Sequence, residues 1–182
     1  MEFKIKFRAF KMEDAAFVNR LRQDEASEST VGGNKRPVAY ERDVKWVQDI
    51  ILGDNPNIIY FAITPKESDD IIGYCSISEI DYRNGTCFWS GTKIDPNTAS
   101  KGIGTESSLL LLKYIFEEMR MERCKGEALE GHEPALRMLD KVGFKKEGLQ
   151  RHKVFKNGKY TNQWLLSMIR EEYDALKIKF DL

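Results

Sequence analysis

The residues Ser100-Lys101-Gly102-Ile103-Gly104-Thr105 have the types and spacing best suited to a chemical task. They follow Asp95-Pro96, which closes an apolar run, and they precede a segment with helical spacing. The start of a helix presents backbone N–H groups and the positive end of the helix dipole, and glycines let a phosphate approach closely. This segment therefore predicts an anion-binding helix start. Taken alone, its two glycines fit an ordinary loop or helix cap equally well.

Two common nucleotide motifs do not explain this segment. The dinucleotide fingerprint requires a third glycine where Ser107 stands. The P-loop requires Gly-Lys-Ser/Thr where the chain has Gly104-Thr105-Glu106. The anion must therefore be identified from other parts of the sequence.

Composition limits the classes of protein to consider. A length of 182 residues without a linker or repeat predicts a single domain over 1–182. Twenty-nine basic and 29 acidic side chains cancel, so neither nucleic acid nor a membrane is expected as a partner. Three widely spaced cysteines without a CxxC pair argue against a disulfide framework and a metal site. No signal peptide or run of ~20 apolar residues is found, so we expect a cytoplasmic protein.

The hydrophobic pattern predicts alternating strands and helices. Strands are expected at about 3–8, 58–63, 71–77, 86–94 and 123–129, and helices at about 12–24, 42–52, 102–119 and 134–142. Asn84-Gly85 and Asn157-Gly158 predict two-residue hairpin turns, and a final apolar strand follows the second turn. These elements predict a mixed α/β fold with a sheet of about seven strands.

Several motifs in the expected order resemble those of the GCN5-related N-acetyltransferase superfamily. They are the strand Phe88 to Ile94 leading into Lys101-Gly102-Ile103-Gly104-Thr105, and the block from Glu133-Pro134-Ala135 to Val142-Gly143-Phe144. The ending, with Glu147-Gly148 and the segment Phe155 to Tyr160, is similar to the branch of ribosomal-protein N-terminal and spermidine acetyltransferases. The resemblance implies a mostly antiparallel sheet with helices on both faces. It also implies acetyl-CoA as the cosubstrate.

The resemblance assigns the cofactor contacts. The family's Gln/Arg-x-x-Gly-x-Gly/Ala loop corresponds to Ala99, Ser100, Lys101, Gly102, Ile103 and Gly104, which with Thr105 would cradle the pyrophosphate. Ala99 departs from the usual Gln or Arg, which implies weakened rather than abolished binding, because most of the contacts are made by the main chain. Thr92, Lys93 and Ile94 would pair with the pantetheine arm where neighbouring strands splay apart. His132 stands where the family usually has an asparagine, and we assign it to the same site.

The usual catalytic groups of the family are missing. Its tyrosine acid corresponds to Leu139, and a common strand carboxylate corresponds to Cys87. The remaining candidates for proton transfer are Glu79, Glu130 and His132. Each also has a simpler interpretation, as a solvated or structural carboxylate or as a histidine at a helix start.

The acceptor side is predicted from aromatic residues and one loop. Tyr40, Tyr82 and Trp89 are candidates for the wall of an amine pocket, although core packing explains such residues equally well. The loop Gly32 to Arg36 suits a lid or a plain solvated loop. We expect direct acetyl transfer to a primary amine of a small molecule such as a polyamine, amino sugar or amino acid. The alternatives are a protein N-terminal acetyltransferase and a non-catalytic acyl-CoA-binding module, and a homodimer is left open.

Overall fold

The computed structural model describes residues 2–25, 28, 36–98 and 102–182. Its elements, in chain order, are β1 (Ile5–Arg8), α1 (Asp14–Gln23), α3 (Tyr40–Leu52), β2 (Ile58–Pro65), β3 (Gly73–Asp81), β4 (Thr86–Ile94), α4 (Ile103–Lys113), the π-helical turn η2 (Tyr114–Glu118), β5 (Arg123–Leu129), α5 (Glu133–Lys141), β6 (Lys145–Lys156), β7 (Lys159–Ile169) and α6 (Arg170–Phe180). None of the helices in these ranges has the length and apolarity needed to cross a membrane.

All of these strands belong to one seven-stranded sheet with the order β1-β2-β3-β4-β5-β7-β6. Only β4 and β5 run parallel, and every other neighbouring pair is antiparallel. A parallel pair needs a crossover connection, and α4 with η2 supplies it. The predicted mixed, mostly antiparallel sheet of seven strands is therefore confirmed.

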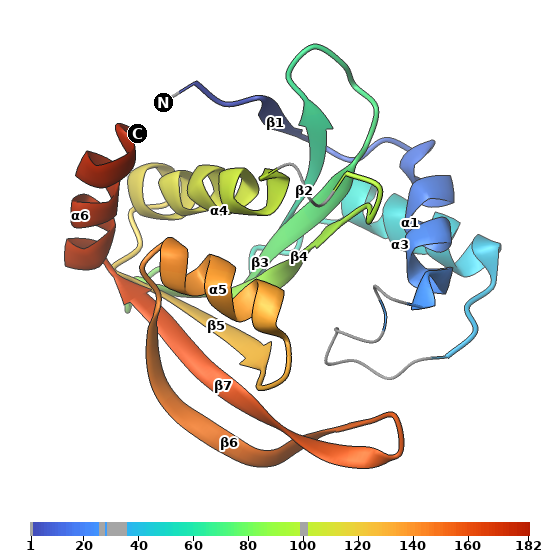
Figure 1. The fold of residues 1–182 in the computed structure, drawn as a ribbon. Coiled ribbons are helices and arrows are strands. Elements are labelled where there is room, and N and C mark those ends of the chain that lie inside the picture. The colour runs from blue at the N-terminus through green and yellow to red at the C-terminus, as the bar shows by residue number, and fades with distance from the viewer. Residues whose placement is uncertain (1, 26–27, 29–35, 99–101) are drawn as a thin grey trace.

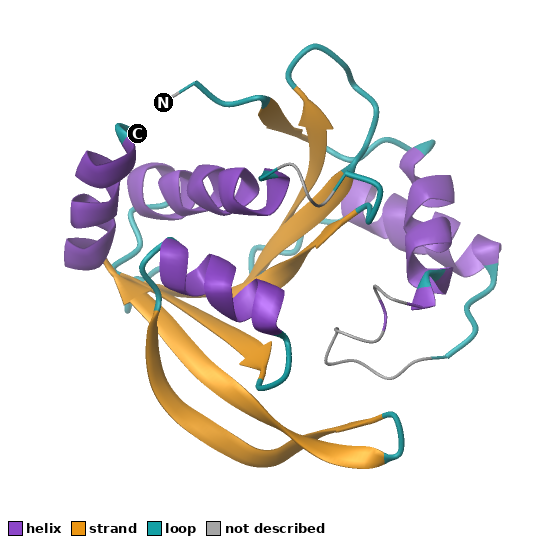
Figure 2. Cartoon of the chain, in the orientation of Figure 1, coloured by secondary structure: helices purple, strands orange, loops and turns teal. Residues whose placement is uncertain are grey.

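Helices cover both faces of the sheet, as Figures 1 and 2 show. On one face, α4, α5 and α6 pack on the main core, which includes Cys75, Ile77, Cys87, Trp89, Leu112 and Phe144. On the other face, α1 and α3 form a second core over β2 and β3, with Phe10, Ala15, Val18, Val47 and Ala62. The second face of β5, β7 and β6 has no helix over it in the described part of the chain (Figure 1). In β5, the half-buried Arg123, Lys125 and Glu127 alternate with the core residues Cys124 and Ala128.

Two sequence-based details of the fold are wrong. Asn84-Gly85 does not form a two-residue turn, because Asp81 pairs with Thr86 and the loop has four residues. The Asp81 carboxylate accepts hydrogen bonds from the backbone N–H groups of Arg83 and Asn84, both at 3.0 Å, and these bonds favour the longer loop. The predicted order of elements also ended on a strand, whereas the chain continues into α6.

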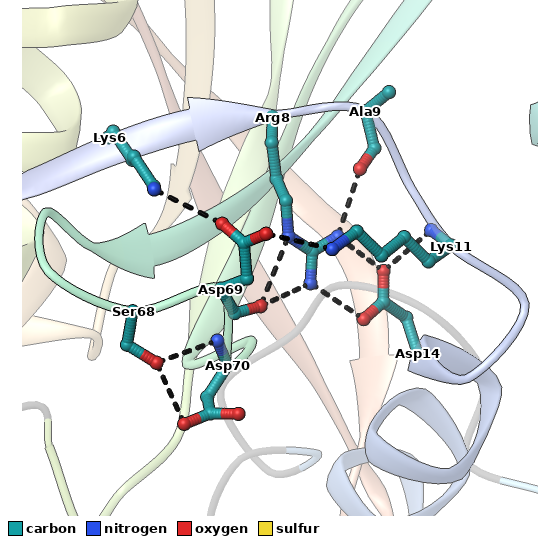
Figure 3. Close-up of polar contacts among 8 residues, drawn as sticks. All are labelled: Lys6, Arg8, Ala9, Lys11, Asp14, Ser68, Asp69 and Asp70. Atoms are coloured by element: carbon teal, nitrogen blue, oxygen red, sulfur yellow. Dashed lines mark hydrogen bonds and ion pairs between the residues drawn. The ribbon is translucent and has the colours of Figure 1, made fainter.

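An ion-pair network joins β1, the start of α1 and the β2–β3 loop (Figure 3). Arg8 binds Asp14 through hydrogen bonds of 2.7 and 2.9 Å, and both side chains are largely buried. The same guanidinium donates to the backbone carbonyl of Asp69 at 2.8 Å. Hydrogen bonds from Lys11 and Lys6 lower the pKa of the Asp69 carboxyl to about 2. The network fixes the start of α1 against the edge of the sheet.

Candidate active site

The sheet opens between β4 and β5. These strands pair only from Thr86 to Phe88, opposite Arg123 to Lys125, although the structure describes both strands throughout. Beyond that point β4 pairs only with β3, and β5 pairs only with β7. The backbone polar groups on the facing edges of the two strands are therefore left for another partner.

A bulge in β4 explains where the opening begins. The register passes from Ile77 opposite Trp89 to Cys75 opposite Thr92, so β4 contains one more residue than β3 over this stretch. Gly91 lies in this stretch with φ of 109°, which favours glycine. A bulge bends its strand and increases the local twist. This bend turns the end of β4 away from β5.

The start of α4 lies beside the end of β4. Gly102 precedes the helix with φ of 81°, in the left-handed region that glycine tolerates. A Cβ built on Gly104 would lie 3.8 Å from Ile94 Cδ1, which places the helix start against the last residue of β4. The predicted loop and the predicted strand residues Thr92 to Ile94 thus meet at one end of the sheet. Ala99, Ser100 and Lys101 lie outside the described residues.

Asp95 fixes the chain that leads from β4 toward α4. One of its carboxylate oxygens accepts hydrogen bonds from the backbone and side-chain nitrogens of Asn97, both at 3.0 Å. The other oxygen binds Arg20 of α1 at 2.7 Å. Burial acts to raise the pKa of the Asp95 carboxyl, but the hydrogen bonds from Arg20 and Asn97 outweigh it and lower the pKa. The carboxylate therefore stays charged and joins α1 to the end of β4.

A second ion pair reaches the same strand. Lys93 Nζ lies 2.8 Å from the carboxylate of Glu28, and both side chains are mostly buried. Lys93 and Asp95 flank Ile94, the last residue of β4. Arg20 of α1 and Glu28 after α1 therefore contact the chain on both sides of Ile94. The side chain of Lys93 is thus occupied by an ion pair.

His132 stands at the other wall of the opening, between β5 and α5. Its Nδ1 is buried and has no hydrogen-bond partner within the described ranges. Burial lowers the pKa of the imidazole, so the ring is neutral at neutral pH. An unpaired buried nitrogen is costly unless a ligand or water satisfies it. His132 therefore fits a site that receives a polar ligand group.

The two carboxylates selected from the sequence have different surroundings. Glu130 lies just past β5, is exposed, and accepts a hydrogen bond from Asn162 Nδ2 at 2.9 Å. Glu79 lies in β3 with φ of 49°, and its carboxylate forms an ion pair of 2.8 Å with Lys125. Glu130 shares the turn after β5 with His132. Glu79 is engaged with a cation across the first part of β4.

Glu127 is a half-buried carboxylate that is not among the candidates predicted from the sequence. It lies two residues beyond Lys125, the last residue of β5 that pairs with β4. Its Oε1 accepts a hydrogen bond from Gln150 Nε2 at 3.0 Å. Cys124 and Ala128 point into the core, so alternation along β5 places Glu127 on the opposite face. That alternation is visible in the sequence and would have identified Glu127.

The structure does not bring the three aromatic candidates together. Trp89 is in the main core, where its ring packs against Phe144 and its Nε1 donates to Thr92 Oγ1 at 3.1 Å. Tyr82 is exposed in the β3–β4 loop, at the opposite end of β4 from the helix start. Tyr40 is exposed at the start of α3. Of the predicted lid Gly32 to Arg36, only Arg36 belongs to the described residues.

The two departures from the family's catalytic pattern are core residues. Leu139 packs inside the main core from α5. Cys87 is fully buried opposite Cys124, and a hydrogen bond with Cys87 together with burial raises the pKa of the Cys124 thiol. These positions therefore contribute packing and supply no proton to the site.

Comparison with known families identifies the chain. Residues 4–145 match the acetyltransferase (GNAT) domain family. The chain therefore belongs to the GNAT acetyltransferases, and the resemblance drawn from its motifs is confirmed. Its activity class is acetyl-CoA-dependent N-acetyltransferase, with acetyl-CoA as the cosubstrate.

The individual relatives share less than a third of their aligned residues with this chain. The chain is 28% identical over 137 residues, 75% of each chain, to an uncharacterized N-acetyltransferase p20 of Bacillus licheniformis. It is 26% identical over 110 residues to a putative ribosomal N-acetyltransferase, YdaF, of Bacillus subtilis, covering 59% of this chain and 58% of that one. Spermidine N-acetyltransferase from Vibrio cholerae, solved with CoA and spermine, superposes with a TM-score of 0.84 at 18% identity. That superposition covers 93% of this chain and 98% of the other, and it shows a shared fold.

Proposed function

We propose that this protein transfers the acetyl group of acetyl-CoA directly to a primary amine of a small molecule. The observation that carries the proposal is the meeting of two features at one end of the sheet. These are the open edge of β4 beyond Phe88 and the glycine-containing start of α4. A strand edge suits the amides of a pantetheine arm, and a helix start suits a pyrophosphate.

Residues on both walls of the opening fit this ligand. The backbone of Thr92, Lys93 and Ile94 would bind the arm, and Gly102 to Thr105 would bind the phosphates, with Ala99, Ser100 and Lys101 completing the loop as the family resemblance implies. The orphan Nδ1 of His132 on the opposite wall is a ready hydrogen-bond partner. The resemblance to a spermidine acetyltransferase solved with CoA and spermine supports a small amine as the acceptor.

Acetyl-CoA supplies an acyl group already activated as a thioester, so the protein must supply a neutral amine and a proton for the departing sulfur. Glu127 and Glu130 accept hydrogen bonds only from carboxamides among their described contacts, so either can take a proton from an ammonium group. Glu79 would first have to give up its ion pair with Lys125. His132, as a neutral imidazole, has a ring N–H to donate toward the sulfur.

The decisive experiment combines turnover with binding. The purified protein is incubated with acetyl-CoA and a panel of small primary amines, with short peptides alongside, and products are detected by mass spectrometry. Binding of coenzyme A is measured separately by calorimetry. Acetylated small amines would support the proposal, and acetylated peptides alone would favour an N-terminal acetyltransferase. Coenzyme A binding without any product would favour a non-catalytic module.

Variants then separate the candidate bases. We expect Glu127→Gln to lower kcat by about a hundredfold. Glu79→Gln serves as the matched control, because its carboxylate is held by Lys125. A larger loss in Glu130→Gln than in Glu127→Gln would transfer the role to Glu130.

A further inference from the structure

A cavity of about 320 Å³ lies between α1 and the segment that leads into α3. It is lined by Arg22 from α1, by Glu28, and by Arg36 and Val38 from the segment before α3. Glu28 connects the cavity to β4, because the Glu28 carboxylate binds Lys93 near the end of that strand. This ion pair links the cavity to the end of β4.

The acidic groups around the cavity already have cationic or amide partners. Glu28 is paired with Lys93, and Asp43 accepts a hydrogen bond from Arg22 Nε at 3.0 Å and another from Asn19 at 2.8 Å. These carboxylates are mostly buried and committed to those contacts. A polycationic acceptor would have to displace Lys93 or Arg22 to reach them.

Arg36 contributes a positive charge that no described residue balances. Among those residues its guanidinium has no ion-pair or hydrogen-bond partner, and the side chain is exposed. Of the charged side chains that line the cavity, Arg22 and Arg36 are basic and Glu28 is acidic, so this lining carries a net positive charge although the whole chain is neutral.

The β6–β7 hairpin adds positive charge at the same end of the sheet. In β7, Gln163 pairs with Leu129, the last residue of β5. The tip of the hairpin, from Gln150 to Gln163, extends past the end of β5. The segment 148–169 contains Arg151, Lys153, Lys156 and Lys159 and no acidic residue. Three of these side chains, those of Arg151, Lys153 and Lys159, are exposed. A local field of this sign attracts anions.

We propose that the acceptor amine carries an anionic group, a carboxylate or a phosphate, which Arg36 binds together with Arg22 in this cavity. The inference rests on the proposed acetyl transfer and specifies its substrate class. A guanidinium presents two parallel donors that match either anion. Amines that are only polycations lack such a group and are correspondingly disfavoured.

The test uses primary amines in matched pairs with acetyl-CoA. One pair is β-alanine and β-alaninamide, the second is glucosamine 6-phosphate and glucosamine, and spermidine represents the polycations. We expect the anionic member of at least one pair to have the higher kcat/KM, and the pair that responds identifies carboxylate or phosphate. Arg36→Gln should lower the ratio of kcat/KM for the anionic member to kcat/KM for the neutral member about tenfold to a hundredfold, as expected for loss of a hydrogen bond to a charged group. Arg36→Lys should restore part of it.

The controls distinguish this inference from the proposed function. Arg83→Gln, which removes an exposed arginine of the β3–β4 loop, should leave every ratio unchanged. Each ratio compares the two amines of a pair on one protein, and differences in the reactivity of the amines cancel when the ratio of the variant is compared with that of the parent. Preference for spermidine, or an equal loss on both members of a pair in Arg36→Gln, would overturn the anionic acceptor and leave acetyl transfer standing. Failure to acetylate any amine would overturn both.

Discussion

Gly104→Val separates binding of the cofactor from stability of the fold. The new Cβ would lie 3.8 Å from Ile94 Cδ1, which is ordinary van der Waals contact, and Gly104 does not have a positive φ. Replacing glycine by valine within a helix changes the free energy of unfolding by less than about 1 kcal/mol. We therefore expect the variant to fold normally, with a melting temperature within about 3 °C of the parent.

The effect on acetyl-CoA should be much larger. A side chain at the start of α4 keeps a phosphate away from the backbone N–H groups there. Losing one hydrogen bond to a charged group costs about 1.5–3 kcal/mol, which corresponds to a rise in KM of about 10-fold to 150-fold. The value of kcat at saturation should change less than about twofold, because the group being blocked is remote from the thioester. Initial rates measured against acetyl-CoA concentration give both constants.

Gly148→Val provides the control. A Cβ at Gly148 in β6 meets nothing within 4 Å, and this residue lies far along the chain from α4. If the two variants show the same KM for acetyl-CoA, the assignment of the helix start to the phosphates is refuted. Unchanged kinetics in a folded Gly104→Val protein would refute the assignment equally.

Three further predictions follow from buried polar groups. Asp14→Asn should lower the free energy of unfolding by about 3 kcal/mol in urea titrations, because it breaks the buried pair with Arg8, whereas Asp49→Asn in an exposed pair of α3 should change it by less than about 0.5 kcal/mol. His132 has a lowered pKa in the folded protein, so its contribution to stability is complete above about pH 6.5 and is lost as the pH falls below that value; His132→Gln should flatten this part of a stability–pH curve. All three cysteines are buried, so a thiol reagent should label them only after denaturant is added, and labelling of the native protein would contradict the packing of the core.

Local patterns predicted the fold wherever a short segment determines its own structure. Asn157-Gly158 forms the expected two-residue turn, with both residues at positive φ, of 49° and 79°. Asn84-Gly85 has the same sequence but lies in a four-residue loop, because the Asp81 carboxylate accepts a hydrogen bond from the backbone N–H of Asn84. The helix α6 was missed although Tyr173, Leu176 and Phe180 have helical spacing, and it is held by Tyr173 stacking on Phe116.

The site was predictable in its backbone and less so in its side chains. A glycine at a helix start needs only a local signal, and Gly102 and Gly104 stand where the motif placed them. Whether Glu79 is available depends on Lys125, which is 46 residues away in the sequence. Trp89 and Phe88 alternate in β4, and only tertiary packing shows that Trp89 faces the core. The cavity beside Arg36 depends on the same kind of long-range packing.

The opening between β4 and β5 affects the resistance of the protein to local unfolding and proteolysis. Within these fully described strands, only the three pairs from Thr86 to Phe88 join the two antiparallel halves of the sheet by backbone hydrogen bonds. Such a seam is where local unfolding and proteolysis should begin. A ligand that fills it would hold the halves together, and at a hundred times its dissociation constant it would add about 2.7 kcal/mol of stability. We therefore expect the amount of this enzyme in a cell to follow the supply of its coenzyme.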